Sequence, residues 1–189
     1  MEKKFKLGFT IGRFQFFHEG HESLIDKGLD LCEKFVILIG SSDKSRTKDN
    51  PFTFEERKEM IETRYCCYSD RLFILPVFDL GIGYVTQWGD YLLNTIKFNL
   101  GETPDFYIGG VESGRENWLI GEGITRVLIS RDLCPISATK CRSELATASD
   151  KEFEASKRGK QGQFIWQNGF YSVEQLKRWR QIIKESGGN

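Results

Sequence analysis

Histidine and proline are scarce in this chain of 189 residues, which carries two histidines and four prolines. No apolar run approaches the roughly 20 residues that a membrane-spanning helix needs, so the sequence predicts no membrane partner. The formal net charge is zero, and a neutral surface predicts no bulk attraction to nucleic acid or to an anionic membrane. Any binding site for an anion must therefore be local.

The sequence also lacks the usual patterns of a zinc site or a disulfide framework. Its cysteines are odd in number, contain no C-x-x-C pair, and lie at Cys32, Cys66, Cys67, Cys134 and Cys141. With only two histidines beside them, we expect no structural metal and no disulfides. The first residues lead into a short strand-like run without the apolar core of a signal peptide. A reducing cytoplasm is the expected setting.

Short apolar runs alternate with amphipathic segments along the chain, which is long enough for a domain with its own core. Near-continuous apolar runs predict five strands, at 5–11, 35–40, 72–77, 106–110 and 126–129. Helical periodicity predicts helices at 19–33, 54–66, 85–100, 137–145 and 172–185, with a weaker helical stretch at 114–119. Strands of this kind are typical of a parallel sheet buried on both faces, so the sequence predicts an α/β fold.

We expect residues 1–146 to form one domain and residues 147–189 a C-terminal helical extension packed on it. The segment 147–162 is rich in charge and reads as a solvated helix or loop. A capping-box pattern from Ser172 to Gln175 begins the final helix. Its apolar side chains share one face, which either covers the domain or forms a contact in a homo-oligomer; they are Leu176, Trp179, Ile182 and Ile183.

The segment G-R-F-Q-F-F-H-E-G-H occupies residues 12–21, between the first strand and the first helix. A helix start offers free backbone N–H groups and the positive end of a dipole, so a phosphate chain could be held there. Gly12 and Gly20 leave room for a ligand, and His18 and His21 can face the same side. The alternative is that the histidines are surface, capping or packed residues.

Further candidates follow other strands, at the carboxyl edge where parallel sheets bind ligands. Gly109, at the end of the fourth strand, permits close approach of a ligand to the backbone. Asp79 and Trp88 suit a planar ring that carries an amide, through hydrogen bonds and stacking. Taken alone, a tryptophan at helical spacing with Tyr91 and Leu92 is more often a core residue.

Two polar segments have phosphate-binding and structural interpretations. The basic loop at 41–51 carries Lys44, Arg46 and Lys48, and it is either a solvated connector or a cover over phosphates. The second segment places Ser137 and Thr139 at a helix start, with Arg142 one turn further along. This arrangement makes either a phosphate cradle or an ordinary N-cap of an amphipathic helix.

Three motifs, in this order, resemble the nucleotidyltransferase superfamily that carries an H-x-G-H signature. They are G-R-F-Q-x-x-H-x-G-H at 12–21, G-S-x-x-x-S-x-x-x-x-N-P-F-T-x-x-E-R at 40–57 and I-S-x-T-x-x-R at 136–142. The first is similar to that of nicotinamide mononucleotide adenylyltransferases of the archaeal and bifunctional bacterial type. Those enzymes usually carry proline where Phe16 stands, and the archaeal ones carry an asparagine between the counterparts of Asp79 and Trp88, which is not seen here.

The resemblance implies a Rossmann-like three-layer fold and transfer of AMP from ATP to nicotinamide mononucleotide, giving NAD and pyrophosphate. It implies Mg²⁺ as the cofactor, held mainly by the ATP phosphates, with no metal ligand from the protein. The implied catalytic residues are His18, His21, Arg13 and Arg142. The implied ATP- and phosphate-binding residues are Gly12, Phe14, Gln15, Gly20, Ser137, Thr139 and Gly109. Asp79, Trp88 and Arg57 are the implied mononucleotide-binding residues.

Three alternatives stay open. One is another transferase of the superfamily, acting on nicotinic acid mononucleotide, phosphopantetheine or a phosphoalcohol. Another is a non-catalytic nucleotide-sensing module on the same fold. The last is a fragment of an aminoacyl-tRNA synthetase, which shares H-x-G-H, although the short chain and its neutral charge argue against it.

Overall fold

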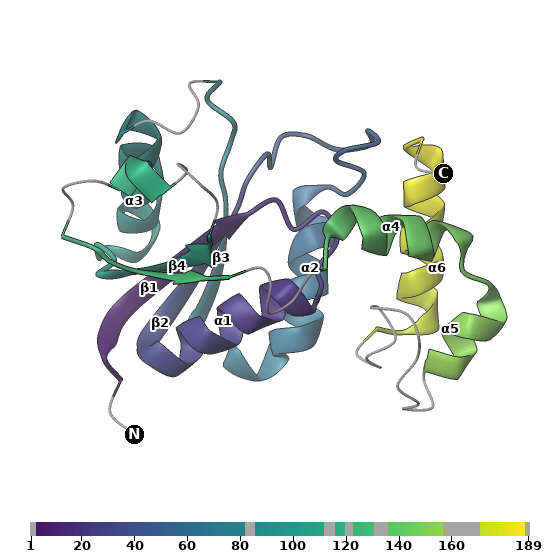
Figure 1. Ribbon diagram of the computed structural model, residues 1–189, viewed down its shortest axis with the longest axis horizontal. Coiled ribbons are helices and arrows are strands. Elements are labelled where there is room, and N and C mark those ends of the chain that lie inside the picture. Colours follow the sequence, from purple (N-terminus) through teal and green to yellow (C-terminus); the bar gives the residue numbers. More distant parts are fainter. Residues whose placement is uncertain are drawn as a thin grey trace. The chain divides into compact units, whose positions relative to one another are not determined.

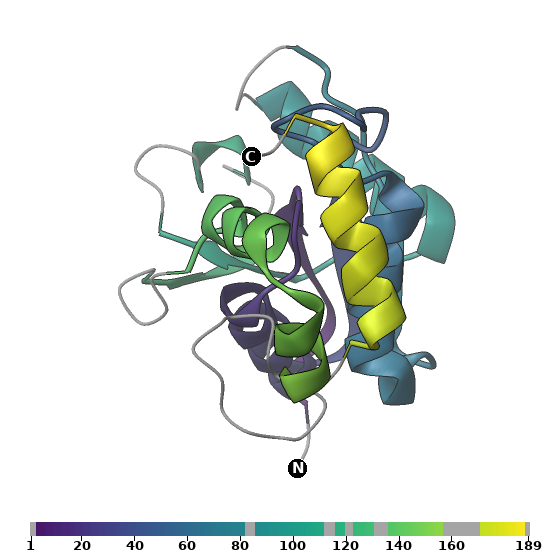
Figure 2. The same ribbon diagram turned by 90° about the vertical axis from the view of Figure 1, so that its right-hand side faces the viewer.

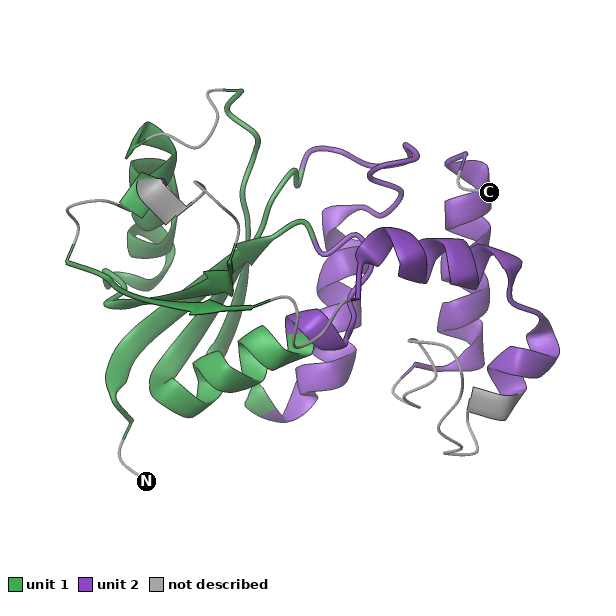
Figure 3. Ribbon diagram, viewed as in Figure 1, with its two compact units in different colours: residues 1–13, 22–42, 68–134 green, residues 14–21, 43–67, 135–189 purple. Residues whose placement is uncertain are grey.

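The computed structural model describes residues 3–81, 86–111, 116–119, 123–130, 136–156 and 171–187. Several sequence expectations fall on residues outside these ranges: the glycine and tyrosine at 83–84, the start of the weak helix at 114–115, Cys134, and much of the charged segment after residue 156. The chain forms two compact units (Figure 3). We call the first, residues 1–13, 22–42 and 68–134, the sheet unit, and the second, residues 14–21, 43–67 and 135–189, the motif unit.

The sheet unit is built on five parallel strands, as the sequence predicts. They are β1 (Phe5–Gly12), β2 (Cys32–Ile39), β3 (Leu72–Pro76), β4 (Phe106–Gly110) and β5 (Thr125–Ile129). Their order is β3-β2-β1-β4-β5 (Figure 1). The strand order therefore changes direction between β1 and β4, which is the place where open α/β sheets form a ligand-binding crevice.

The ladder between β1 and β4 is short at this switch point. It pairs Gly8 with Phe106 and Phe9 with Tyr107, whereas the β1–β2 ladder continues to Gly12 opposite Ile39. The carboxyl end of β1 therefore extends beyond its register with β4. The exposed fraction of Thr10, the first residue past the shared register, is only 1%.

Helices cover both faces of the sheet, which gives the three-layer arrangement (Figure 1). On one face α1 (Glu19–Leu31) packs so closely that a Cβ on Gly28 would lie 2.3 Å from the ring of Phe35. On the other face α3 (Thr86–Leu100) and the short 3-10 helix η2 (Glu116–Leu119) share an apolar core with β1 and β2. This core includes Leu7, Phe9, Val36, Leu38, Trp88, Leu92 and Trp118.

One predicted boundary is wrong by two residues. The sequence predicts that the first helix continues to Glu33, but α1 ends at Leu31 and β2 begins at once with Cys32. Cys32 pairs with Phe5 in the β1–β2 ladder and is fully buried. Ladder pairing and burial therefore override the helical pattern of a short polar stretch.

The motif unit is helical and contains α2 (Phe54–Tyr65), α4 (Ala138–Thr147), α5 (Asp150–Ser156) and α6 (Val173–Glu185). The capping box expected at Ser172–Gln175 is confirmed, and a second capping box joins Thr53 to Glu56. The expected apolar face of α6 is buried. Figure 2 shows α6 alongside α2, where Gln175 Nε2 donates to Glu59 Oε1 at 3.0 Å and to Thr63 Oγ1 at 3.2 Å.

The charged segment after residue 147 includes a short helix, α5, fixed to α6 by ion pairs. Asp150 accepts from Lys177 Nζ at 2.9 Å and from Arg180 Nη2 at 2.7 Å. Both C-terminal helices belong to the same unit as residues 14–21 and 43–67. The division into residues 1–146 and 147–189 stays a prediction. Among the described helices, none combines the length and apolar character needed to cross a bilayer.

Candidate functional site

The turn between β1 and α1 brings its aromatic residues around His21. Phe14 has a φ of 51°, a left-handed conformation that is uncommon for a bulky residue. Its side chain is buried, and its ring centroid lies 4.6 Å from that of His21. The backbone N–H of His21 donates to the His18 carbonyl at 2.8 Å. The strained turn thus fixes the position of one histidine relative to the other.

His18 and His21 lie side by side at the start of α1. Their ring centroids are 3.8 Å apart and their planes differ by 21°. Phe17 continues the stack on His21, with a centroid distance of 5.7 Å and an angle of 23°. Tyr65 of α2 packs edge-on against Phe17 at 6.2 Å. The imidazoles are therefore held by ring contacts as well as by the helix.

Gln15 joins the three sequence motifs. Its side-chain Nε2 donates to the Phe52 carbonyl at 3.0 Å, and its Oε1 accepts from the Phe52 N–H at 3.0 Å. Its backbone carbonyl accepts a hydrogen bond from Nη1 of Arg142. The first motif supplies Gln15, the second Phe52 and the third Arg142, so segments far apart in the sequence meet at one buried residue.

The start of α4 carries the hydroxyl groups expected of a phosphate cradle. Ser137 is the N-cap, and its side chain accepts from the Lys140 N–H at 3.2 Å. Thr139 Oγ1 accepts from Arg142 Nη2 at 3.4 Å. Arg142 is buried, with an exposed fraction of 9%. A fixed guanidinium and two hydroxyls therefore gather at a helix N-terminus, where the dipole favours an anion.

The loop at 43–53 is held by one of its own basic residues. Arg46 makes a paired contact with Glu56, through Nη1–Oε2 at 2.8 Å and Nη2–Oε1 at 2.6 Å, and also donates to the Pro51 carbonyl at 3.1 Å. Burial by itself would raise the pKa of Glu56, but hydrogen bonds from Arg46 and the Thr53 N–H lower it below its ordinary value. Lys44 and Lys48 are exposed, as Arg46 is.

Arg57, on α2, is completely buried. Its Nε donates to the Thr53 carbonyl at 3.1 Å. Buried guanidinium groups need partners, because an isolated charge in a low-dielectric interior is very costly. The Nε side of the Arg57 guanidinium group therefore points toward Thr53, the N-cap of the same helix.

In the sheet unit, the remaining candidates lie near strand ends. Ser41 Oγ lies 3.0 and 2.9 Å from the two carboxylate oxygens of Asp79, which fixes the orientation of that side chain. The Gly12 carbonyl accepts from the Gly40 N–H at 2.9 Å. Arg13 is exposed. These contacts place Gly12 at the end of β1, Gly40 just after β2 and the Asp79 carboxylate after β3.

Two other candidates of the sheet unit, Trp88 and Gly109, have packing contacts that account for them without a ligand. Trp88 is 8% exposed and belongs to the apolar core cluster. Its ring centroid lies 5.6 Å from that of Tyr91. At Gly109, a Cβ would lie 2.2 Å from the hydroxyl of Tyr107. The absence of a side chain at Gly109 is thus explained by Tyr107 without a ligand.

Sequence reasoning missed the aromatic cluster beneath the first motif. Phe16 is almost fully buried, with ring centroids 6.2 Å from Phe52, 6.1 Å from Tyr171 and 5.8 Å from Trp179. The last two rings meet edge-on at 4.8 Å. The sequence did carry a signal for this cluster, because Phe14, Phe16 and Phe17 lie within four residues of a predicted turn. So many large apolar side chains indicate that the turn is buried.

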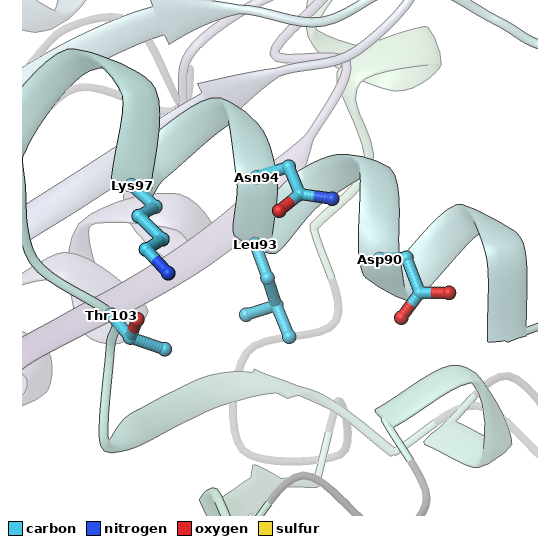
Figure 4. A pocket seen from close by; sticks show the side chains of 5 residues that line it. All are labelled: Asp90, Leu93, Asn94, Lys97 and Thr103. Atoms are coloured by element: carbon cyan, nitrogen blue, oxygen red, sulfur yellow. The ribbon is translucent and has the colours of Figure 1, made fainter.

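A small hollow lies against α3 in the sheet unit (Figure 4). Its volume is about 180 Å³, and it is lined by Asp90, Leu93, Asn94, Lys97 and Thr103. Pockets for small molecules usually measure about 300–1,000 Å³, and none of the candidate residues lines this one. We therefore do not assign it to a substrate.

Comparisons with known proteins place these observations in a family. The chain is 38% identical over 97 residues to the nicotinamide-nucleotide adenylyltransferase of Saccharolobus solfataricus, covering 49% of this chain and 55% of that protein. It is 38% identical over 73 residues to the enzyme of the same name from Haloarcula marismortui, covering 39% of each chain.

A similar solved structure is the bifunctional NMN adenylyltransferase/ADP ribose pyrophosphatase from Francisella tularensis, complexed with AMP and a manganese ion. Its TM-score is 0.67 at 24% identity, over 97% of this chain and 53% of that one. A second structure of the Francisella protein gives a TM-score of 0.71 at 21% identity, over 97% of this chain and 54% of that one. These similarities confirm the fold.

The chain spans about half the length, or less, of the relatives that it matches. A family model described as cytidylyltransferase-like matches residues 9–144, which is most of this chain. The chain belongs to the cytidylyltransferase-like family.

Proposed function

We propose that this chain is an adenylyltransferase that transfers AMP from ATP to nicotinamide mononucleotide, giving NAD and pyrophosphate. The observation that carries the proposal is the junction at Gln15, where Arg142 and the backbone of Phe52 are both bound. This junction joins residues of all three motifs within the motif unit, which supports a shared role in binding phosphate. The names of the relatives, nicotinamide-nucleotide adenylyltransferase, support the choice of reaction.

The proposed reaction needs no nucleophile from the protein. A phosphate oxygen of nicotinamide mononucleotide attacks the α-phosphorus of ATP, and the bond from that phosphorus to the pyrophosphate oxygen breaks. Positioning and charge neutralisation then supply most of the rate. We assign His18 and His21 to the phosphates and to the charge that develops on them. Arg13 and Arg142 add fixed positive charge through guanidinium groups.

The remaining phosphate contacts come from backbone and hydroxyl groups. Ser137 and Thr139, at the start of α4, are suited to the triphosphate because a helix N-terminus attracts anions. Gly12 and Gly20 allow close approach of the nucleotide. Phe14 supports His21 through its ring contact. We assign Gln15 to positioning, because both polar atoms of its side chain are bound to Phe52.

For the other substrate groups we propose the following contacts. Arg57 is assigned to the mononucleotide phosphate and Gly109 to the adenosine. Asp79 is suited to the polar groups of the nicotinamide nucleotide, since Ser41 holds its carboxylate in one orientation. Trp88 is assigned to the nicotinamide ring itself.

The donor set fits a metal ion that is carried by the nucleotide. Within the described ranges, no three His, Cys, Asp or Glu side chains lie close enough together to hold one. Mg²⁺ commonly keeps its waters and binds substrate phosphates with few protein ligands. When bound in this way, it would neutralise charge on the phosphates.

We also propose a reducing cytoplasm as the setting and no nucleic-acid partner. The thiols of Cys32, Cys66, Cys67 and Cys141 are free, as expected for proteins of a reducing compartment. The equal numbers of acidic and basic residues give no bulk attraction to nucleic acid.

The direct test incubates the purified chain with ATP, Mg²⁺ and one acceptor at a time, and follows both pyrophosphate and the dinucleotide. We expect NAD from nicotinamide mononucleotide. Lys140→Ala, which removes a cation from α4 that has no assigned role, should change kcat by less than about twofold. Arg142→Ala should remove most of the activity. Nucleotide binding without pyrophosphate release from any acceptor would overturn the proposal in favour of a sensing module.

A second candidate is a transferase of the same family that uses another phosphorylated acceptor. It is favoured by the burial of Trp88, which leaves little of this ring available to a nicotinamide. Nicotinic acid mononucleotide, phosphopantetheine and a phosphoalcohol in the same assay distinguish the candidates. Pyrophosphate release that depends on one of these acceptors, and not on nicotinamide mononucleotide, identifies the second candidate.

A further inference from the structure

Two adjacent cysteines lie exposed at the C-terminal end of α2. Cys66 and Cys67 begin the 3-10 helix η1 (Cys66–Tyr68), and their Sγ atoms are 3.8 Å apart. The other two cysteines in the described part of the chain, Cys32 and Cys141, are fully buried. Burial raises their pKa values to about 11 and about 12, respectively. Solvent reagents therefore meet Cys66 and Cys67 before the buried pair.

We propose that Cys66 and Cys67 form a two-sulfur chelating site for a thiophilic metal or metalloid centre, with trivalent arsenic in a monosubstituted arsenical as its best-matched ligand. Sulfur is the soft ligand that such centres prefer. A tetrahedral centre with metal–sulfur bonds of about 2.3 Å separates two sulfurs by about 3.8 Å, and a pyramidal trivalent arsenic centre holds them somewhat closer. The Sγ atoms of Cys66 and Cys67 are 3.8 Å apart, so a small rotation of the two exposed side chains brings them to the arsenic geometry.

Covalent geometry disfavours the competing fate, a disulfide between the two residues. A disulfide needs an S–S distance of about 2.05 Å and a Cα–Cα distance of about 4.4–6.8 Å. Adjacent residues joined by a trans peptide have Cα atoms only about 3.8 Å apart. The two sulfurs consequently stay available to one shared ligand.

The number of donors selects the ligand. Among the residues with described positions, no group of three or more His, Cys, Asp or Glu side chains could surround a metal, so none of these residues adds a third donor to the two sulfurs. A monosubstituted arsenic(III) oxide has two valences to satisfy. Two As–S bonds form, the As=O bond breaks, and the oxygen leaves as water with the two thiol protons. The oxidation state of arsenic does not change, so no oxidant or reductant is needed.

The test treats the reduced, folded full chain with one equivalent of phenylarsine oxide and measures its intact mass. We expect one adduct, heavier by phenylarsine oxide less one water. Because the second As–S bond is intramolecular, the adduct should resist a monothiol up to about millimolar concentration. A small dithiol should remove it, since it also offers two sulfurs.

Single substitutions locate the site. Cys66→Ser and Cys67→Ser should each give at most an adduct that the monothiol removes, while Cys134→Ser should behave as the unmodified chain. Both serine variants should melt like the parent, because the replaced thiols are exposed; Cys67→Ala provides a second version if the serine destabilises η1. A resistant adduct in Cys66→Ser or Cys67→Ser, its loss in Cys134→Ser, or no adduct on the parent chain would overturn the proposal.

Discussion

The sheet unit and the motif unit are stabilised in different ways. In the sheet unit, apolar side chains on paired strands pack against helices on both faces, and Phe9, Val36 and Leu92 are typical of its core. In the motif unit, rings and side-chain-to-backbone hydrogen bonds connect segments from distant parts of the sequence. The first arrangement follows from local periodicity. The second depends on a few individual contacts, so single substitutions should affect the two units differently.

The largest expected effect comes from Trp179→Ala in the aromatic cluster. Truncating a buried aromatic side chain usually costs about 3–5 kcal/mol of stability, and Phe16 would lose one of its two edge-on partners. The matched change in the sheet unit is Ile96→Ala, which removes a fully buried side chain from α3. We expect both substitutions to lower the midpoint of thermal unfolding. At temperatures well below that midpoint, where both variants are folded, we expect only Trp179→Ala to lower kcat. Equal kcat values in the two variants would remove the distinction between the units.

The next largest effect separates the chemistry of the motif unit from its stability. His21→Ala removes an imidazole proposed to stabilise charge in the transition state, so kcat should fall by about 100- to 1,000-fold. The KM for ATP should change much less, because the other phosphate contacts remain. Steady-state kinetics and a melting curve of the same sample provide the measurement. An unchanged kcat in a folded variant would contradict the proposed role of His21.

A smaller effect is expected from Gln15→Leu, which sharpens the comparison at the junction itself. The substitution removes both side-chain bonds to Phe52 but keeps the backbone carbonyl that accepts from Arg142. Leaving buried backbone groups unpaired costs about 1–3 kcal/mol each. We expect a lower melting midpoint together with a lower kcat. If kcat per folded molecule stays at the parent value, Gln15 supports the fold only.

The smallest expected effect is a pH dependence that originates in the loop at 43–53. The folded protein lowers the pKa of Glu56, so its contribution is present above the unfolded pKa and is lost as the pH falls through the lower folded value. The Arg46 side chain is 47% exposed, which limits the contribution to below about 1 kcal/mol. Denaturant unfolding of the parent and of Glu56→Gln, from neutral to acidic pH, should show this loss in the parent only.

Local patterns predicted the sheet unit well. Runs such as 35–40 are apolar throughout, and a buried parallel strand requires that character, so all five strands were recognised. The capping boxes at Thr53 and Ser172 were equally accessible, since their partners lie three residues away. The exception, the early start of β2 at Cys32, arose because pairing with β1 is not a local property.

The contacts that build the candidate site could not be predicted from local sequence patterns, because they join residues far apart in the sequence. Gln15 and Arg142 were identified as members of motifs, but the sequence did not show that one would donate to the carbonyl of the other across 127 positions. The engagement of Arg46 by Glu56 was hidden because both residues had other plausible uses. The substrate-binding and catalytic roles of the candidate residues stay predictions.

The dependence of Phe16 on Trp179 has a consequence for synthesis in the cell. The ribosome makes all five strands before it reaches α6, so the sheet can assemble before the ring of Phe16 can pack against Trp179. At about 5–20 residues per second, this delay is on the order of ten seconds. A nascent chain would thus acquire a formed sheet first, and the complete aromatic cluster around Phe16 only after the last helix has emerged.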